Sequence, residues 1–299
     1  MRAQHLLAFS LLAFIWGTTW LAIKFVVHEV PPLTAAGLRF ALAALLLAGF
    51  ARFRGRSLGW RHLRPSERRL LLVLSVLMFA VPYALIFYGE QFITSALTAI
   101  LFSSAPAFTL LFDSLYTRRN LLSGARLSGL VLAFAGVVAI FLPRLSGPSA
   151  ELRGALAVVA AAATSSLALV LAKYGARNID TLVGTTWQMT GGAIWLLLAG
   201  LAVERPTLGS YSPPAILGLL YLAVLGSCVT FVLFYGLLKQ MATVQLSSLA
   251  FITPVVAVFV GWLVLDEVLG ASTLPGAAVV LLGVALLHRR VPEPLAVGD

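Results

Sequence analysis

Long runs of apolar residues, separated by short polar or turn-forming segments, dominate this sequence. An α-helix rises 1.5 Å per residue, so about 20 apolar residues cross the hydrocarbon core of a bilayer. Windows of this length predict ten membrane-spanning helices, five in each half of the chain. Their approximate ranges are 6–27, 33–52, 70–90, 95–116, 124–143, 154–172, 181–202, 214–238, 245–266 and 272–288.

A second pattern relates the two halves, because several residues recur 147 positions later. They are Tyr88-Gly89 with Tyr235-Gly236, Gly129 with Gly276, and Gly136 with Gly283, while Pro106 recurs as Pro254 one position out of register. Five spans per half would start the second half on the opposite side of the membrane. We therefore expect an all-α polytopic membrane protein, with two inverted five-helix repeats around a central cavity, as in many secondary transporters. The repeats would cover residues 1–147 and 148–290, followed by a cytoplasmic tail, 291–299.

Composition supports a membrane protein. Of 299 residues, 60% are hydrophobic and only 11% are charged, whereas soluble domains keep roughly a quarter of their residues charged. The single cysteine, Cys228, provides neither a disulfide framework nor a thiolate metal cluster. The sequence also lacks a nucleotide-binding glycine loop, zinc-type histidine spacing and a Gly-x-Ser-x-Gly elbow. We therefore expect no metal, no cofactor and no enzymatic activity.

The net charge of +10 is unevenly placed. Seven arginines crowd one loop: Arg52, Arg54, Arg56, Arg61, Arg64, Arg68 and Arg69. Such clusters mark the cytoplasmic face of membrane proteins and contact anionic lipid heads, so we expect no nucleic-acid partner. With the amino terminus inside, 16 Lys and Arg residues fall on the cytoplasmic side, and only Arg144, Arg153 and Arg205 fall outside. This predicts a multi-pass protein of the cell's inner (plasma) membrane with both termini cytoplasmic.

The first two spans contain the charged and aromatic residues that suggest a binding cavity. Trp16, Trp20 and Lys24 are four residues apart and share one helical face. They could form a wall that holds an amphipathic solute by stacking and charge; alternatively, Trp20 packs and Lys24 snorkels to the outer surface. Arg39 lies about 9 Å into its span, where a guanidinium needs water, a partner or a polar cavity. We favour a cavity role for Arg39 over snorkelling towards Glu29.

Prolines and small polar residues extend this hypothesis to other spans. Pro82, Pro106 and Pro254 fall inside predicted spans and would break their helices. The further cavity candidates are Tyr83, Phe87, Ser103, Ser104, Trp187, Gln188 and Thr253. Each hydroxyl could instead bond its own helix.

Two acids and a set of glycines have a structural interpretation. Asp113 is the only carboxylate well within a span; we expect it to pair with a loop arginine, Arg118 or Arg119, rather than carry protons. Glu90, at the outer end of the third span, is its rival for a proton-carrying role. The glycines spaced by seven in the fifth and tenth spans predict close helix packing rather than cavity walls.

An ordered set of motifs resembles the ten-span drug/metabolite transporters of the EamA type. The motifs are Trp16 to Trp20 (WGTTW) with Lys24, Pro31-Pro32-Leu33, Leu38-Arg39-Phe40, Ala105-Pro106, Phe251 to Pro254 (FITP), Gly261 and Asp266-Glu267-Val268. The resemblance implies a basket of helices around a cavity, alternating access, and export of amino acids or related metabolites. It also implies that the family's glutamate after the ninth span is Glu267. The first half departs from that pattern with Arg118-Arg119-Asn120.

Together these observations predict a secondary transporter that exports small amphipathic metabolites, with amino acids as the expected solute. Arg39 or Lys24 would neutralise a carboxylate, protons could couple transport, and the protein would be a monomer or homodimer. An alternative cargo is a sugar phosphate or nucleotide sugar, although such ligands usually require several cations. A membrane protein without transport activity is a further alternative.

Overall fold

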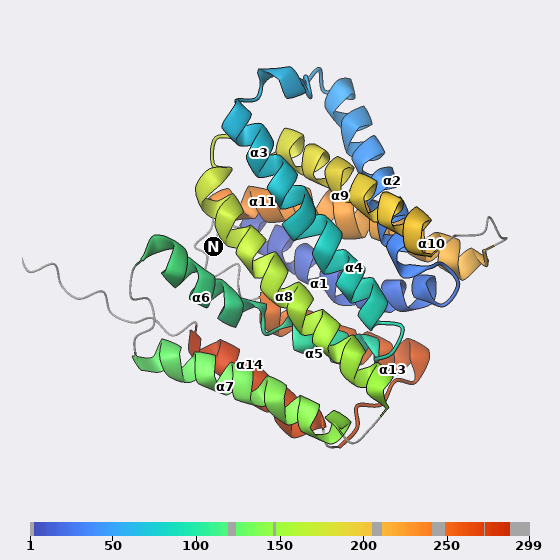
Figure 1. Cartoon of the computed structure of the whole chain (residues 1–299), viewed down its shortest axis with the longest axis vertical. Helices are drawn as coiled ribbons and strands as arrows, with labels where there is room; N and C mark the ends of the chain where they lie inside the picture. Colours follow the sequence, from blue (N-terminus) through green and yellow to red (C-terminus); the bar gives the residue numbers. More distant parts are fainter. Residues whose placement is uncertain are drawn as a thin grey trace, which may run out of the picture.

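The computed structural model describes residues 3–118, 124–145, 148–204, 211–240, 249–271 and 273–287. These residues form helices and connections, with no strand among them. The first half contains α1 (Ala3–Val27), α2 (Pro32–Phe53), η1 (Trp60–His62), α3 (Pro65–Leu74), η2 (Ser75–Ala80), α4 (Val81–Gly89), α5 (Ser95–Phe102), α6 (Ala105–Thr117), α7 (Gly124–Phe141) and η3 (Leu142–Leu145). The second half contains α8 (Ser149–Gly175), α9 (Thr181–Val203), α10 (Pro213–Ala223), η4 (Val224–Val229), α11 (Thr230–Gln240), α13 (Leu249–Leu265) and α14 (Thr273–Leu287). Figure 1 shows their arrangement.

The predicted all-helical membrane protein is confirmed at the level of its helices. Seven helical segments are long and apolar enough to cross a bilayer: Leu7–Val27, Pro32–Phe53, Pro65–Gly89, Ser95–Thr117, Ser149–Gly175, Thr181–Val203 and Pro213–Leu237. Three shorter apolar helices are Arg126–Phe141, Ile252–Leu265 and Thr273–Leu287. Each of these segments overlaps one predicted span. The inverted relation between the two halves stays a prediction.

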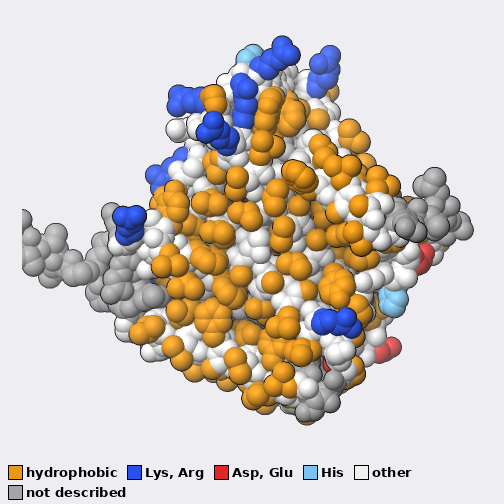
Figure 2. All heavy atoms as spheres, viewed as in Figure 1, with side chains coloured by type: hydrophobic (Ala, Val, Ile, Leu, Met, Phe, Trp, Pro, Cys, Tyr) orange, Lys and Arg blue, Asp and Glu red, His pale blue; other side chains and the backbone are white. Residues whose placement is uncertain are grey.

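The surface has the polarity expected of a chain in a bilayer. Hydrophobic side chains cover the broad middle of the face in Figure 2, and many Lys and Arg side chains gather at the end where α2 finishes and α3 begins. Large apolar side chains such as Leu45, Phe53 and Leu217 are well exposed, and lipid tails would cover them. Some predicted topological charges, at Arg2, Arg119, Arg205, Arg289 and Arg290, lie outside the described residues, as does the predicted tail 291–299.

Two helices are interrupted by wide turns rather than by breaks. A π-helical segment, η2, joins α3 to α4, and η4 joins α10 to α11. Pro82 is the second residue of α4, directly after η2, and the helix runs on through it. Pro254 likewise lies inside the continuous helix α13. The prediction that these two prolines break their helices is therefore wrong, because a π-turn or neighbouring groups can accommodate a missing donor.

Pro106 does accompany an interruption. Ser103 and Ser104 end the regular turns of α5, and Pro106 is the second residue of the new helix α6. Proline suits the first turn of a helix because its missing N–H would have no partner there.

The predicted packing of small residues is confirmed for α7 and α14, which lie side by side at the bottom of Figure 1. A Cβ added to Gly136 would lie 2.5 Å from the backbone nitrogen of Val280 and 2.8 Å from the carbonyl oxygen of Gly276. A Cβ on Gly129 would similarly meet the carbonyl oxygen of Gly283 at 2.7 Å. The two backbones therefore approach too closely for side chains at these positions.

Gly136→Ala should lower the free energy of unfolding by about 1–3 kcal/mol, because the added methyl group overlaps main-chain atoms that cannot move alone. Thermal unfolding in detergent would measure the change. Gly49→Ala in α2 is the matched control, since a Cβ there meets nothing within 4 Å. Equal melting temperatures for both variants would contradict the close packing of α7 on α14.

Candidate functional site

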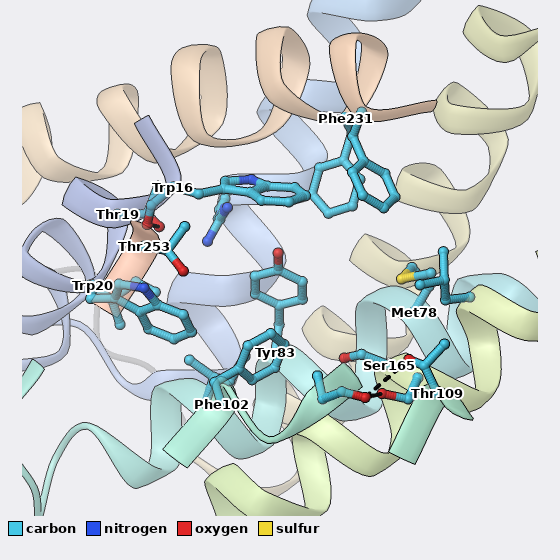
Figure 3. A pocket seen from close by; sticks show the side chains of 17 residues that line it. Trp16, Thr19, Trp20, Met78, Tyr83, Phe102, Thr109, Ser165, Phe231 and Thr253 are labelled. Carbon is cyan, nitrogen blue, oxygen red and sulfur yellow. Dashed lines mark hydrogen bonds between the residues drawn. The ribbon is translucent and has the colours of Figure 1, made fainter. Parts of the chain in front are cut away.

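A cavity of about 180 Å³ is lined by residues of α1, α2, η2, α4, α5, α6, α8, α11 and α13 (Figure 3). Aromatic side chains provide much of its wall: Trp16, Trp20, Tyr83, Phe102, Phe231 and Phe234. Arg39 is the one charged side chain among the described lining residues. The cavity therefore combines a largely apolar wall with a single positive charge, which is the composition of a small-molecule site.

Arg39 is buried, with 1% of its surface exposed, and is held by contacts from several helices. Its Nε donates to the Ser227 hydroxyl at 2.8 Å, and one Nη donates to the Gly226 carbonyl at 2.8 Å. The guanidinium carbon lies 4.7 Å from the ring centre of Tyr83 and 5.2 Å from that of Phe40. These carbonyl, hydroxyl and π contacts compensate in part for removing a cation from water.

The π-helical segment η4 explains how this arginine finds its partners. Gly226 and Ser227 both belong to η4, where the wider turn changes the usual i→i+4 ladder. A Cβ on Gly226 would lie 2.9 Å from the Thr19 methyl group and 3.4 Å from an Arg39 nitrogen. Glycine at this position thus permits close approach of α1 and of the guanidinium.

Two donors in the wall have no hydrogen-bond partner among the described residues. They are the remaining Nη of Arg39 and the indole Nε1 of Trp20, both buried. Buried donors normally have a partner, so an acceptor group on a bound molecule would satisfy them. Each of these donors is suited to a carboxylate oxygen.

Several hydroxyl groups in the wall can accept hydrogen bonds rather than donate them to a bound molecule. Thr109, Ser165 and Thr253 each donate to a carbonyl of their own helix, at 3.0, 2.8 and 3.0 Å. Their oxygens therefore retain lone pairs that can accept. In Figure 3, Thr109 and Ser165 lie across Tyr83 from Trp16 and Trp20. Thr253 instead lies beside Trp20 in the same view, so the cavity offers acceptors both next to the unpartnered indole and away from it.

Five of the predicted cavity residues line this cavity: Trp16, Trp20, Arg39, Tyr83 and Thr253. Arg39 contacts η4 rather than Glu29, which instead accepts a hydrogen bond from the Ser212 backbone at 2.7 Å. Sequence reasoning missed Phe102, Phe231 and Phe234, because an aromatic residue within an apolar run gives no sign of which way it faces.

The other six predicted residues do not line it: Lys24, Phe87, Ser103, Ser104, Trp187 and Gln188. Phe87 is fully buried in the core between helices. The two serines donate to carbonyls of their own helix, as the alternative interpretation predicted. Trp187 donates to the Leu58 carbonyl and packs on Trp60, while Gln188 accepts from Tyr235 beside a second, smaller cavity.

Lys24 lies beyond the cavity, where α1 meets the connection between α4 and α5. Its Nζ donates to the carbonyls of Glu90 and Ile93, at 2.7 and 2.8 Å. Neither of the two predicted roles for Lys24, cavity wall or snorkelling group, describes this contact. A cation that satisfies carbonyls after a helix end is common because those carbonyls have no partner within the helix.

Two glutamates cap helices at the same end of the bundle, opposite the arginine-rich loop. Glu267 accepts from the backbone and hydroxyl of Ser95 and from the Ala96 backbone, at 2.9, 2.7 and 3.2 Å. Glu204 accepts from Leu33 and Thr34 at the start of α2. Both carboxylates accept from N–H groups that have no partner within their helix, and their negative charge interacts favourably with the positive end of the helix dipole. Glu267 thus caps a helix that is distant from it in sequence.

Asp113 has a different partner from the one predicted. Its carboxylate accepts from Lys173 of α8 at 2.8 Å and from Tyr174 at 2.6 Å. Arg118 is exposed, and Arg119 lies outside the described residues. A cation on a facing helix can reach an intramembrane acid more directly than a loop arginine beyond the helix end.

The apolar belt, the helical bundle and the central cavity define a polytopic membrane protein with an internal small-molecule site. The chain belongs to the EamA-like transporter family, whose profile matches residues 4–142 and 152–289. It is therefore a membrane transporter of that family.

Curated relatives are similar over most of their length. The uncharacterized transporter YoaV of Bacillus subtilis is 29% identical over 90% of this chain and 91% of its own. The uncharacterized inner membrane transporter YedA of Escherichia coli is 29% identical over 95% and 90%, and Protein PagO of Salmonella typhimurium is 27% identical over 84% and 81%. A solved crystal structure aligns with 96% of this chain and 98% of its own at a TM-score of 0.70 and 18% identity, which shows a shared fold.

Ser227→Ala should lower the free energy of unfolding by about 1–3 kcal/mol, because the buried Nε of Arg39 loses its acceptor. Denaturant titration in detergent would measure this loss. Ser128→Ala is the control, since Ser128 is exposed and bonds its own helix at 3.3 Å. A Ser227→Ala protein as stable as the control would show that this contact does not hold the guanidinium.

Proposed function

We propose that this transporter exports small amphipathic metabolites that contain a carboxylate, with amino acids as its solutes. The observation that carries the proposal is Arg39: a buried guanidinium facing the cavity with one nitrogen free of partners in the described structure. A solute carboxylate would accept from this nitrogen and from the indole of Trp20, forming charge-assisted hydrogen bonds away from bulk water.

The remaining groups of an amino acid also match the wall. Its ammonium group would donate to hydroxyl oxygens such as those of Thr109 and Ser165, whose protons are already used. Its side chain would pack on the aromatic residues. Aromatic faces also attract an ammonium group directly, so the site needs no carboxylate of its own.

The alternative cargo, a sugar phosphate or nucleotide sugar, is less suited to this cavity. Such ligands carry two or more negative charges and several hydroxyl groups. Lys24, the second cation considered for the site, is bound to two carbonyls outside the cavity. A single cation in an aromatic wall favours a monoanion or a zwitterion.

Transport would occur by alternating access. The duplicated sequence pattern and the separate family matches in each half support two repeats, residues 1–147 and 148–290. In our proposal the repeats are inverted, both termini are cytoplasmic, and one repeat rocks against the other around the cavity. The arginine-rich end would then be the inner face and the end capped by Glu204 and Glu267 the outer face.

Arg39→Gln should weaken amino-acid binding and reduce flux at least tenfold, because one charge-assisted hydrogen bond is worth about 1.5–3 kcal/mol. Purified protein would first be screened by thermal shift against amino acids, since a bound ligand stabilises the folded state. Radiolabelled phenylalanine and leucine in proteoliposomes would then measure flux. Arg54→Gln is the matched control, because Arg54 is exposed next to Phe50.

Ligand analogues separate the parts of the proposal. Phenethylamine lacks the carboxylate, so its weaker thermal shift should be the same in wild type and Arg39→Gln. An equal phenylalanine shift in both proteins would remove Arg39 from the site. Saturable flux of a sugar phosphate without amino-acid flux would favour the alternative cargo.

A further inference from the structure

Glu90 is a buried acid to which the proposed transport site assigns no role. It follows the last residue of α4, in the connection to α5, and none of its surface is exposed. Neither carboxyl oxygen has a hydrogen-bond partner among the described residues. This differs from Glu204 and Glu267 at the same end of the bundle, whose carboxylates each accept several hydrogen bonds.

An ionised carboxylate in such a place would be costly. Burial of a charge without hydrogen bonds costs several kcal/mol, and a titratable group normally avoids this cost by becoming neutral. The arrangement around Glu90 therefore fits a carboxylic acid that holds its proton in this conformation.

The charged groups that face Glu90 come from three elements: Lys24 from α1, Arg39 from α2, and Glu267 from the segment after α13. Lys24 does not hydrogen-bond the carboxyl group; its ammonium donates to the main-chain carbonyls of Glu90 and Ile93 instead. On α8, Gly154 packs against Gly89, while Arg153 is exposed and bonds its own helix. Glu151, half-buried in the first turn of α8, is the other charged group of that helix at this end.

This acid and its neighbouring cation lie directly beyond the cavity. Glu90 is four residues after Ile86, and Lys24 is four residues after Trp20; both Ile86 and Trp20 line the cavity. Residues four apart lie above one another on a helix. A change of charge at Glu90 would therefore act one helical turn from the bound solute.

We propose that Glu90 is the proton-binding site that couples solute export to the proton gradient, an inference that rests on the transport function proposed above. In the conformation open to the outer face, the carboxylate would take a proton from water and become a neutral acid. In the conformation open to the cytoplasm, the O–H bond would break and the proton would pass to water on that side. One proton would thus enter for each cycle of export.

The protonation state of Glu90 would change the contact that Lys24 makes. While Glu90 is neutral, Lys24 remains on the two carbonyls and ties α1 to the connection between α4 and α5. Loss of the proton would leave a carboxylate close to the ammonium, and Coulomb attraction in a low-dielectric site would draw Lys24 away from those carbonyls. The protonation state of Glu90 would thereby control a contact that closes the predicted outer end of the cavity.

Glu90→Gln, which resembles the neutral acid, tests the proposal. Wild type in proteoliposomes should accumulate radiolabelled phenylalanine against its gradient when a pH gradient is imposed. Glu90→Gln should lose this accumulation and the pH dependence of flux, and it should slow the exchange of labelled for unlabelled phenylalanine, because a permanently neutral side chain leaves Lys24 on the two carbonyls. The thermal shift caused by phenylalanine should remain. Glu29→Gln is the matched control, because Glu29 is exposed at the same end of the bundle; it should retain accumulation.

Infrared difference spectroscopy supplies a second readout that needs no solute. A pH step should change a carboxylic-acid C=O band in wild type, and that band should be absent in Glu90→Gln. In Lys24→Met the same band should persist to higher pH, because removal of the cation destabilises the carboxylate.

The outcomes separate this proposal from the transport function. Absence of amino-acid flux in wild type would overturn the proposed function, and the infrared band would still test Glu90. Normal proton-driven accumulation in Glu90→Gln, or a pH-dependent band that survives the substitution, would overturn the role of Glu90 and leave the transport function intact.

Discussion

The cost of placing one guanidinium inside an apolar helical bundle organises the centre of this protein. Arg39 is buried, and its charge is compensated by a carbonyl and a hydroxyl from the π-helical segment η4 and by the rings of Phe40 and Tyr83. Because these partners come from different segments, burying Arg39 also fixes how α2, α4 and η4 meet. The cavity lies beside this guanidinium, which is fixed by several contacts but keeps one nitrogen without a hydrogen-bond partner in the described structure.

The same rule of satisfying polar groups away from water governs the end of the bundle opposite the arginine-rich loop. Glu204 and Glu267 cap helices far away in sequence, and Lys24 donates hydrogen bonds to carbonyls between α4 and α5. Each contact gives a hydrogen-bond partner to main-chain groups at a helix end, which would have none in the bilayer interior. Glu90 is the exception among these groups, and an unsatisfied acid beside a cation is suited to a switch rather than to a cap.

The glycine contact between α7 and α14 lies away from the cavity, whereas α4 and α8 meet through glycines and also line it. The glycine-lined pair α7 and α14 brings two backbones into contact and contributes nothing to the described cavity wall. The helices around the cavity instead contain wide turns, an interruption at Ser103-Ser104 and polar groups. Family membership fixes the class, a membrane transporter, while the chemistry of the wall supports a carboxylate-containing solute.

The sequence by itself determined the helices, since runs of about 20 apolar residues have one stable solution in a bilayer. It also indicated Arg39, because a charged side chain deep in a span requires a polar partner or a cavity. The sequence further indicated the glycine face shared by α7 and α14, because the spacing and size of residues can be read locally. Only the tertiary structure decided which side chains share a cavity. Phe231 and Phe234 face it, whereas Phe87, Trp187 and Gln188 do not. The direction of a side chain in a uniformly apolar helix depends on its neighbours, and those neighbours come from distant parts of the chain.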